Sequence, residues 1–290
     1  MRILTLLTLL LLLSCSSKEE QLTKEEQFEI NTFVSHLTAS IQNLEYDFLR
    51  NAWSHEVFKQ RISDEMEADA TAFKYIYDEK IKVEVQIANN DLINKQKYSN
   101  GSIKYLTTEF FRNHAEVSYL LFFDGSFKLI KYRIEKYGQK LVLSDYFMIT
   151  QNVWASEYMS NIAMVNKRYR NRSKKRIEAN ENFNLYRQYI EHGDSSSALY
   201  YLNQIPKTHH IGNYLSLLKI RCAAGINDTV FVETLLTESE GNNSLYLDYL
   251  TAYYIGDTLE LNKMYMFLKN EHKVPEEDLT RIREDELIWQ

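Results

Sequence analysis

The stretch AEVSYLLFFDGSFKLIKYRIEKYG, residues Ala115–Gly138, decides the fold that the sequence predicts. Its first part alternates in polarity, and one side of the resulting strand carries Ala115, Val117, Tyr119, Leu121 and Phe123. Asp124-Gly125 is typical of a tight hairpin turn. Residues 127–137 then form the returning strand. The stretch therefore predicts two antiparallel strands joined by a short turn.

More strands are expected on both sides of this hairpin. Gly138-Gln139 turns the chain into residues 141–149, and residues 103–111 come in front. Residues 102–150 therefore predict an antiparallel meander. Residues 80–88 also alternate, but no turn residue separates them from the helical pattern before them, so strand and helix both remain open there.

Helices are expected before the sheet. Thr23-Lys24-Glu25-Glu26 has the form of a capping box, and apolar side chains follow it at helical spacing. Helices packed on one face of an antiparallel sheet make an α+β domain, here residues 24–150. The order of elements is similar to that of NTF2-like α+β domains. That resemblance implies a cone-like cavity in which Tyr119, Leu121 and Phe123 face the covering helices.

Three glycines recur in the C-terminal half. Gly193, Gly225 and Gly256 are separated by 32 and 31 residues, and each stands between two apolar helical stretches. Glycine suits the left-handed end of a helix, and the Asp, Ser and Thr residues that follow suit the start of the next helix. Helical hairpins repeated at such a period stack into a solenoid.

These hairpins resemble tetratricopeptide (TPR) repeats, placed here in residues 182–290 with a last helix, residues 276–288, as a cap. An irregular helical bundle with unrelated glycines remains the alternative. The predicted fold class is therefore α+β, with N-terminal helices packed on an antiparallel sheet, followed by an all-α TPR-like solenoid.

The N-terminus, MRILTLLTLLLLLSC, predicts an export signal. After Arg2 comes an apolar run of eleven residues, which is too short to span a bilayer as a helix. Its end, LLSC, resembles the lipobox of bacterial lipoproteins. The resemblance implies that residues 1–14 are removed, that Cys15 carries lipid such as palmitate, and that residues 15–23 form a tether.

The residues after Cys15, SSKEE, are similar to the export signal of surface lipoproteins of Bacteroidetes-type bacteria. The resemblance implies an anchor in the outer membrane, with the protein facing the periplasm or the cell surface. Since Cys15 is used for lipid, Cys222 is left alone, and its apolar surroundings in sequence favour a buried thiol.

A basic segment lies in the linking helix predicted for residues 151–181. Seven of the eleven residues 166–176 are basic. A solvated helix that faces acidic neighbours and a contact with anionic lipid headgroups are both compatible with this pattern. Nucleic acid is not expected as a partner, because no recognition fold is evident. The candidate residues for an anionic surface are Lys167, Arg168, Arg170, Arg172, Lys174, Lys175 and Arg176.

Composition excludes several classes of protein. With 290 residues, a net charge of −6, 2 Cys, 2 Pro and 8 Gly, the chain is neither a disulfide scaffold nor a low-complexity polymer nor a basic nucleic-acid binder. No HExxH, GxSxG or glycine-rich phosphate loop occurs. The sequence therefore predicts no enzyme, no cofactor and no metal site.

Tyrosine is abundant, with 21 residues. Tyrosine combines a large contact area with a polar tip, which suits both helical cores and binding surfaces. The candidates for partner binding are Tyr200, Tyr201, Tyr214, Tyr246, Tyr249 and Tyr253. The leading hypothesis is a lipid-anchored interaction protein, an adaptor or scaffold for another envelope protein. The alternative is a module that binds a small ligand or glycan in the cavity of the α+β domain.

Overall fold

The computed structural model describes residues 22–66, 92, 94–148, 153–160, 174–205, 214–240, 244–285 and 288–289. Three helices come first, α2 (Lys24–Gln42), α3 (Tyr46–Ala52) and α4 (His55–Met66). The strands that follow are β1 (Ser102–Phe110), β2 (Ala115–Phe123), β3 (Ser126–Tyr137), β4 (Lys140–Met148) and β5 (Val153–Trp154). The expectations for residues 1–14, for Cys15, for residues 80–88 and for most of the basic segment lie outside the described residues.

The remaining elements are mostly helical. They are α8 (Lys174–Glu191), α9 (Ser195–Asn203), α10 (Tyr214–Ala224), α11 (Asp228–Ser239), α12 (Leu245–Ile255), α13 (Thr258–Glu271), α14 (Glu276–Glu284) and the short strand β6 (Ile288–Trp289). None of the described helices combines the length and apolarity needed to cross a bilayer.

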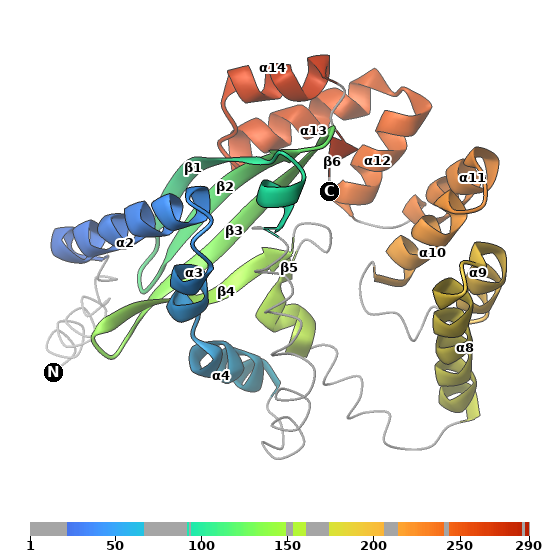
Figure 1. Cartoon of the computed structure of the whole chain (residues 1–290), viewed down its shortest axis with the longest axis horizontal. Helices are drawn as coiled ribbons and strands as arrows, with labels where there is room; N and C mark the ends of the chain where they lie inside the picture. Colours follow the sequence, from blue (N-terminus) through green and yellow to red (C-terminus); the bar gives the residue numbers. More distant parts are fainter. Residues whose placement is uncertain are drawn as a thin grey trace, which may run out of the picture.

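The strands form one sheet in the order β1-β2-β3-β4-β5, with antiparallel neighbours (Figure 1). Asp124 and Gly125 make the two-residue turn between β2 and β3, both with positive φ (33° and 68°), as a primed hairpin turn requires. The C-terminal β6 pairs in parallel with the start of β3. Residues 288–289 thus lie beside the start of the hairpin's second strand.

One face of the sheet packs on the N-terminal helices. Its core contains Val117, Tyr119 and Leu121 of β2 together with Ile30, Val34 and Leu37 of α2. The hydroxyl of Tyr119 lies 3.0 Å from Oγ1 of Thr38, so even its polar tip is satisfied inside this core. Tyr119, Leu121 and Phe123, expected to face a cavity, are all buried here.

The opposite face packs on helices from the end of the chain. Leu120 and Phe122 of β2 and Phe127 and Leu129 of β3 share a core with residues of α12, α13 and α14. Charged contacts reinforce this packing: Nζ of Lys104 on β1 lies 2.7 Å from Oδ2 of Asp278 on α14. Helices therefore cover the sheet on both faces (Figure 1).

The predicted fold class is wrong, and this second core is the reason. The prediction placed the covering helices before the sheet and made residues 182–290 an all-α unit of its own. In the structure most helices are C-terminal, and α12 to α14 bury part of the sheet face opposite the N-terminal helices, its outer face. The overall class is mixed α+β with an antiparallel sheet, residues 102–154, flanked by helices.

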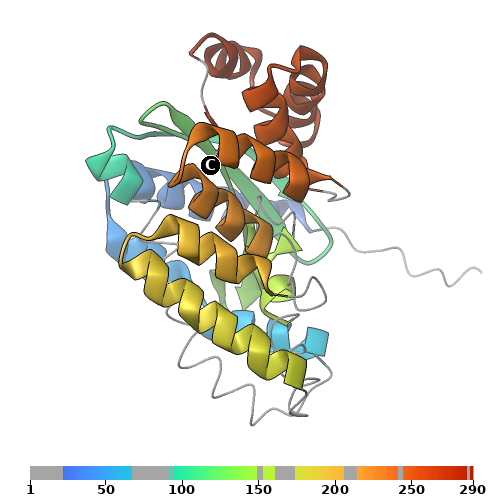
Figure 2. The ribbon, with the colours of Figure 1, turned by 90° about the vertical axis from the view of Figure 1, so that its right-hand side faces the viewer.

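Between α8 and α13, each helix packs against the next one along the chain, and α8 to α12 lie side by side (Figure 2). Gly256 ends α12 in the left-handed conformation, φ 73°, and Gly193 after α8 has φ 76°. Gly225 differs, because its φ is not left-handed and a Cβ there would lie 2.4 Å from Oγ of Ser195. Because Gly225 has no side chain, the turn after α10 can lie close to Ser195 at the start of α9.

Candidate functional site

The outer face of the sheet is divided along its strands into two halves. In β2 this face carries Glu116 and Ser118 and then Leu120 and Phe122, because side chains alternate between faces. In β3 it carries Phe127 and Leu129 and then Lys131 and Arg133. We call these the apolar half, which α12 to α14 cover, and the charged half.

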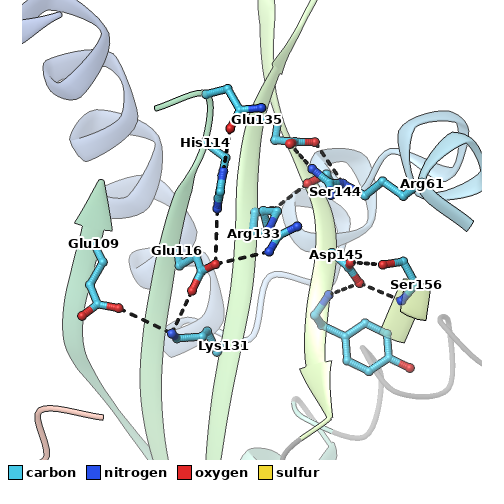
Figure 3. A network of polar contacts seen from close by, with 12 residues as sticks. Arg61, Glu109, His114, Glu116, Lys131, Arg133, Glu135, Ser144, Asp145 and Ser156 are labelled. Atoms are coloured by element: carbon cyan, nitrogen blue, oxygen red, sulfur yellow. Dashed lines mark hydrogen bonds and ion pairs between the residues drawn. The ribbon is translucent and has the colours of Figure 1, made fainter. Parts of the chain in front are cut away.

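Glu116 is the centre of the charged half (Figure 3). Its carboxylate accepts from Nζ of Lys131 at 2.8 Å and from Nη2 of Arg133 at 3.3 Å, and Nε2 of His114 lies 3.3 Å away. Burial by itself would raise the pKa of Glu116, but the hydrogen bonds from His114 and Lys131 and the charges of Lys131 and Arg133 outweigh it and lower the pKa to about 2. Glu116 is therefore ionised at every physiological pH.

A pocket of about 400 Å³ lies over this network. That volume is within the range of small-ligand sites, roughly 300–1,000 Å³. Its walls come from all five strands of the meander and from the end of α13. The lining residues are Glu109, Glu116, Lys131, Phe147, Trp154, Phe267, Glu271, His272 and Lys273. Glu271 and Lys273 are exposed, so the pocket opens to solvent on their side.

Aromatic rings form two walls of the pocket. Phe147 of β4 and Trp154 of β5 meet edge to face with ring centroids 5.4 Å apart. The guanidinium of Arg133 lies 4.1 Å from the centroid of Trp154. On the helical side, the rings of Phe267 and His272 meet edge to face with their centroids 5.1 Å apart. The pocket therefore joins apolar ring faces to closely paired charges.

His272 is the buried polar group of the helical wall. It is 7% exposed, and burial, assisted by the charge of Lys131, lowers its pKa to about 4. The ring is thus neutral at pH 7, with one nitrogen that donates and one that accepts. Among the described residues, neither ring nitrogen has a hydrogen-bond partner. A ligand in the pocket would meet an unused donor and acceptor.

Two buried polar atoms of the charged half also lack partners within the described part of the chain, Oγ of Ser118 and Nε of Arg133. Buried polar groups in folded proteins are nearly always hydrogen-bonded, so each exception calls for an explanation. Both atoms belong to residues that pair across the strands with the network, Ser118 with Lys131 and Arg133 with Glu116. Three further such atoms among the described residues lie elsewhere, on Trp53, Gln96 and Thr251.

Asp145 positions the aromatic wall. Its Oδ1 accepts from the backbone N–H of Tyr146 at 2.9 Å and of Ser156 at 3.1 Å, and its Oδ2 accepts from the hydroxyl of Ser156. These bonds, drawn in Figure 3, join β4 to the residues just after β5. They support the pairing of β4 with β5 that places Trp154 against Phe147. Burial raises the pKa of Asp145 to about 6.

The tyrosines proposed for partner binding are distributed over two separate cores. Tyr249 is fully buried, and Tyr246 and Tyr253 pack partly buried against the same core of α12 and the sheet. Tyr201 is partly buried and stacks on Tyr189 of α8 at 5.3 Å. Of the set, Tyr200 and Tyr214 have large exposed fractions, 59% and 44%.

Most of the remaining predicted site residues lie outside the part of the chain that the structure describes. Cys15 and residues 167–173 lie outside the described residues, and Lys174, Lys175 and Arg176 form the first turn of α8. Cys222 is buried. No cluster of three or more metal-ligating side chains occurs in the described ranges.

Sequence reasoning missed the charged half because it followed the other face of β2. A signal was present: Glu116 and Ser118 alternate with apolar residues, whereas residues 119–123 are apolar on both faces. That change within one strand indicates that the outer face is covered only along part of its length. His272 had no comparable signal, since it reaches the pocket through the packing of α13.

No protein-family model matches the chain, and no curated protein matches it. Among solved structures, a phospholipid-binding protein from Ralstonia solanacearum in complex with a phospholipid is similar. The identity is 17% and the TM-score 0.34, over 48% of this chain and 86% of that chain. A similarity of this size carries no inference about the fold or the ligand.

Proposed function

We propose that this protein is a lipid-anchored, ligand-binding protein of the cell envelope, whose pocket over the charged half takes a small polar molecule. The pocket carries the proposal, because the imidazole of His272, which has no hydrogen-bond partner among the described residues, lines it beside Lys131 and Glu116. The anchor is the acylation of Cys15 that the lipobox resemblance implies. The role is binding without catalysis.

The charges around the pocket favour a ligand without net charge. Lys131 lies 2.8 Å from Glu116 and 3.4 Å from Glu109, so its ammonium is already compensated. A single ionic group on the ligand would have to compete with these pairs. Hydroxyl or amide groups would instead add hydrogen bonds to oxygens and nitrogens that keep spare capacity. An apolar ring face would lie against Trp154 or Phe147.

Binding can be measured with defined probes and one designed pair of variants. The probes are glucose, N-acetylglucosamine, inositol, choline and benzoate. Binding is followed by ligand-observed NMR and by intrinsic tryptophan fluorescence, to which Trp154 contributes. We expect at least one neutral probe to bind, and His272→Phe, which removes both ring nitrogens, to weaken binding at least tenfold. His192→Phe, an exposed position after α8, is the matched control and should bind as the wild type does.

Two results would refute the ligand-binding proposal. The first is that no probe and no small molecule extracted with the native protein occupies the pocket. The second is a bound probe whose affinity is equal in the wild type, His272→Phe and His192→Phe. Binding of choline or benzoate alone would keep the pocket as a site and reject a neutral ligand.

An adaptor role is the second candidate, and one observation favours it. Helices α8 to α11 extend beside the sheet as a row, and Tyr200 and Tyr214 are exposed on it (Figure 2). Removing residues 182–290 would also uncover the sheet, so point variants are the better test. If a partner binds here, Tyr200→Ala with Tyr214→Ala should lose a protein that cross-links to the wild type in membranes. Unchanged cross-linking would reject this surface.

The anchor has its own experiment. Metabolic labelling with palmitate should mark the wild-type protein and leave Cys15→Ala unlabelled. Label that persists in Cys15→Ala would refute the lipobox interpretation. The serine beside it, Ser14, offers a control change to alanine that should keep the label.

A further inference from the structure

Four aromatic side chains are exposed at one end of the molecule. They are Phe28 of α2, Phe110 at the end of β1, Phe111 in the following turn and Tyr137 at the end of β3, with exposed fractions of 73%, 37%, 42% and 48%. We call this group the tip surface. Clusters of exposed apolar side chains are uncommon on monomeric proteins and mark contacts with membranes or partners.

The topology places these residues at the same end. In an antiparallel meander, the β1–β2 and β3–β4 turns lie at one end of the sheet and the β2–β3 turn at the other. Helix α2 joins this end through its first part, because Nζ of Lys136 on β3 lies 3.4 Å from Oε2 of Glu29. Figure 1 shows the start of α2 and both hairpin ends on the same side of the molecule.

The start of α2, the described segment that follows the proposed lipid anchor in sequence, lies beside the tip surface. Helix α2 starts at Lys24, capped by Thr23, and Glu29 follows the cap by six residues, or about 9 Å along a helix. Cys15 precedes Leu22 by seven residues, and a chain of that length spans at most about 25 Å. An acyl chain at Cys15 would therefore keep this end of the sheet close to the bilayer.

We propose that the tip surface rests on the bilayer, with its aromatic rings at the level of the lipid headgroups. This inference depends on the proposed anchor at Cys15 and not on the identity of the pocket's ligand. Aromatic side chains with an apolar body are enriched at membrane interfaces. Exposed cations flank the rings, Arg112 in the β1–β2 turn and Lys140 at the start of β4, and would face anionic headgroups.

The orientation has a consequence for the pocket. Glu109 and Glu116 stand next to the β1–β2 turn, so the charged half is the membrane-proximal half of the sheet. The apolar half and its covering helices α12 to α14 would point away from the bilayer. A ligand would then enter the pocket from a region near the headgroups.

Site-specific quenching tests this orientation on the full acylated chain. The protein is reconstituted in vesicles of phosphatidylethanolamine and phosphatidylglycerol that contain a lipid with a nitroxide on its headgroup. A fluorophore is attached at Asn113→Cys or Gln139→Cys in the two turns, and at Asn203→Cys at the end of α9 as the matched control. All three positions are exposed, and Cys222 is 1% exposed and does not compete for the label.

We expect quenching at positions 113 and 139 to be at least twofold stronger than at 203, and the double change Phe111→Ser with Tyr137→Ser to abolish the difference. Equal quenching at all three positions would overturn the proposal. A second result would also overturn it: the fluorophores are protected from solvent in native membranes but are not quenched by the nitroxide lipid in vesicles. That result would assign the tip surface to a protein partner. Protein that does not float with the vesicles would refute the anchor itself.

Discussion

The two halves of the outer sheet face use the same strands for opposite purposes. On the apolar half, Leu120 and Phe127 are fully buried under C-terminal helices. On the charged half, Glu116 is almost as deeply buried, at 7% exposed, but its neighbours are Lys131 and Arg133. The pairing of β2 with β3 runs through both halves without a shift of register. The difference therefore lies in what covers them, a packed helical layer or a pocket.

The charges of Glu116, Lys131 and Arg133 call for a different explanation from the apolar residues beside them. Burial of apolar side chains stabilises a fold, whereas buried ion pairs are often no better for stability than apolar residues of the same size. The apolar half accounts for the docking of α12 to α14. The charged half borders the pocket instead. Stability explains the first half, and the proposed binding role would explain the second.

The largest expected effect concerns the apolar half. Phe127→Ala should lower the free energy of unfolding by about 4 kcal/mol, because it empties a fully buried site in contact with Tyr249. Urea denaturation of the purified protein measures this change. Tyr137→Ala, at an exposed position of the same strand, should cost less than about 0.5 kcal/mol. Equal losses in the two variants would contradict the assigned core.

The charged half should be nearly as sensitive when one charge is removed. Glu116→Ala leaves the half-buried Lys131 and Arg133 without their shared carboxylate, with Glu109 still near Lys131, and should cost about 3 kcal/mol. The same denaturation experiment applies, with Glu25→Ala on the exposed start of α2 as the control. A loss no larger than that of the control would show that the network is not a buried unit.

Asp145 and Glu116 should make the free energy of unfolding depend on pH in opposite directions. Since the folded pKa of Asp145, about 6, lies above its ordinary value of 3.8, the protein should lose stability as pH rises from 4 to 6, by about 2 kcal/mol relative to Asp145→Asn. Glu116 has the reverse linkage, because its folded pKa of about 2 lies below 4.5. Relative to Glu116→Gln, the wild type should lose stability as pH falls from 4.5 to 2.

These slopes are read from denaturation midpoints at a series of pH values. The difference between wild type and Asp145→Asn should be flat above pH 7, where the carboxyl is ionised in both states. If the wild type instead gains stability relative to Asp145→Asn as pH rises from 4 to 6, the pKa of Asp145 is not raised in the folded protein.

The smallest effect is expected at the edge of the apolar half. Lys104 on β1 pairs with Asp278 of α14, but its side chain is 39% exposed. Lys104→Ala should therefore cost only about 0.5 kcal/mol. Amide hydrogen exchange should report faster opening of α14, while α2 keeps its rates. Unchanged exchange in α14 would show that apolar contacts alone hold this helix on the sheet.

Much of the chain's local structure could be predicted. The turn at Asp124-Gly125 and the capping box at Thr23 and Glu26 depend on a few neighbouring residues, and both are present in the structure. Gly193 and Gly256 end helices in the left-handed conformation for the same local reason. The packing of the C-terminal helices on the sheet could not be predicted in this way, because it joins residues more than a hundred positions apart.

The candidate site was harder to predict than the fold. Glu116, Lys131 and Arg133 are recognisable as outward-facing positions of strands, but their mutual distances depend on the register of β2 and β3. His272 enters the pocket only because α13 ends beside Lys131. A site assembled from five strands and a helix end leaves no spacing pattern in the sequence.

The sequence by itself determined the strands, the turns, the helix caps and the tendency of each segment to be buried, because these depend on periodicity and on interactions between close neighbours. Only the tertiary structure decided that α12 to α14 cover one half of the outer face and leave the charged half to a pocket. It also decided which exposed aromatics gather at the start of α2. Such choices depend on the shape that distant surfaces present to one another, and shape arises only when the whole chain has packed.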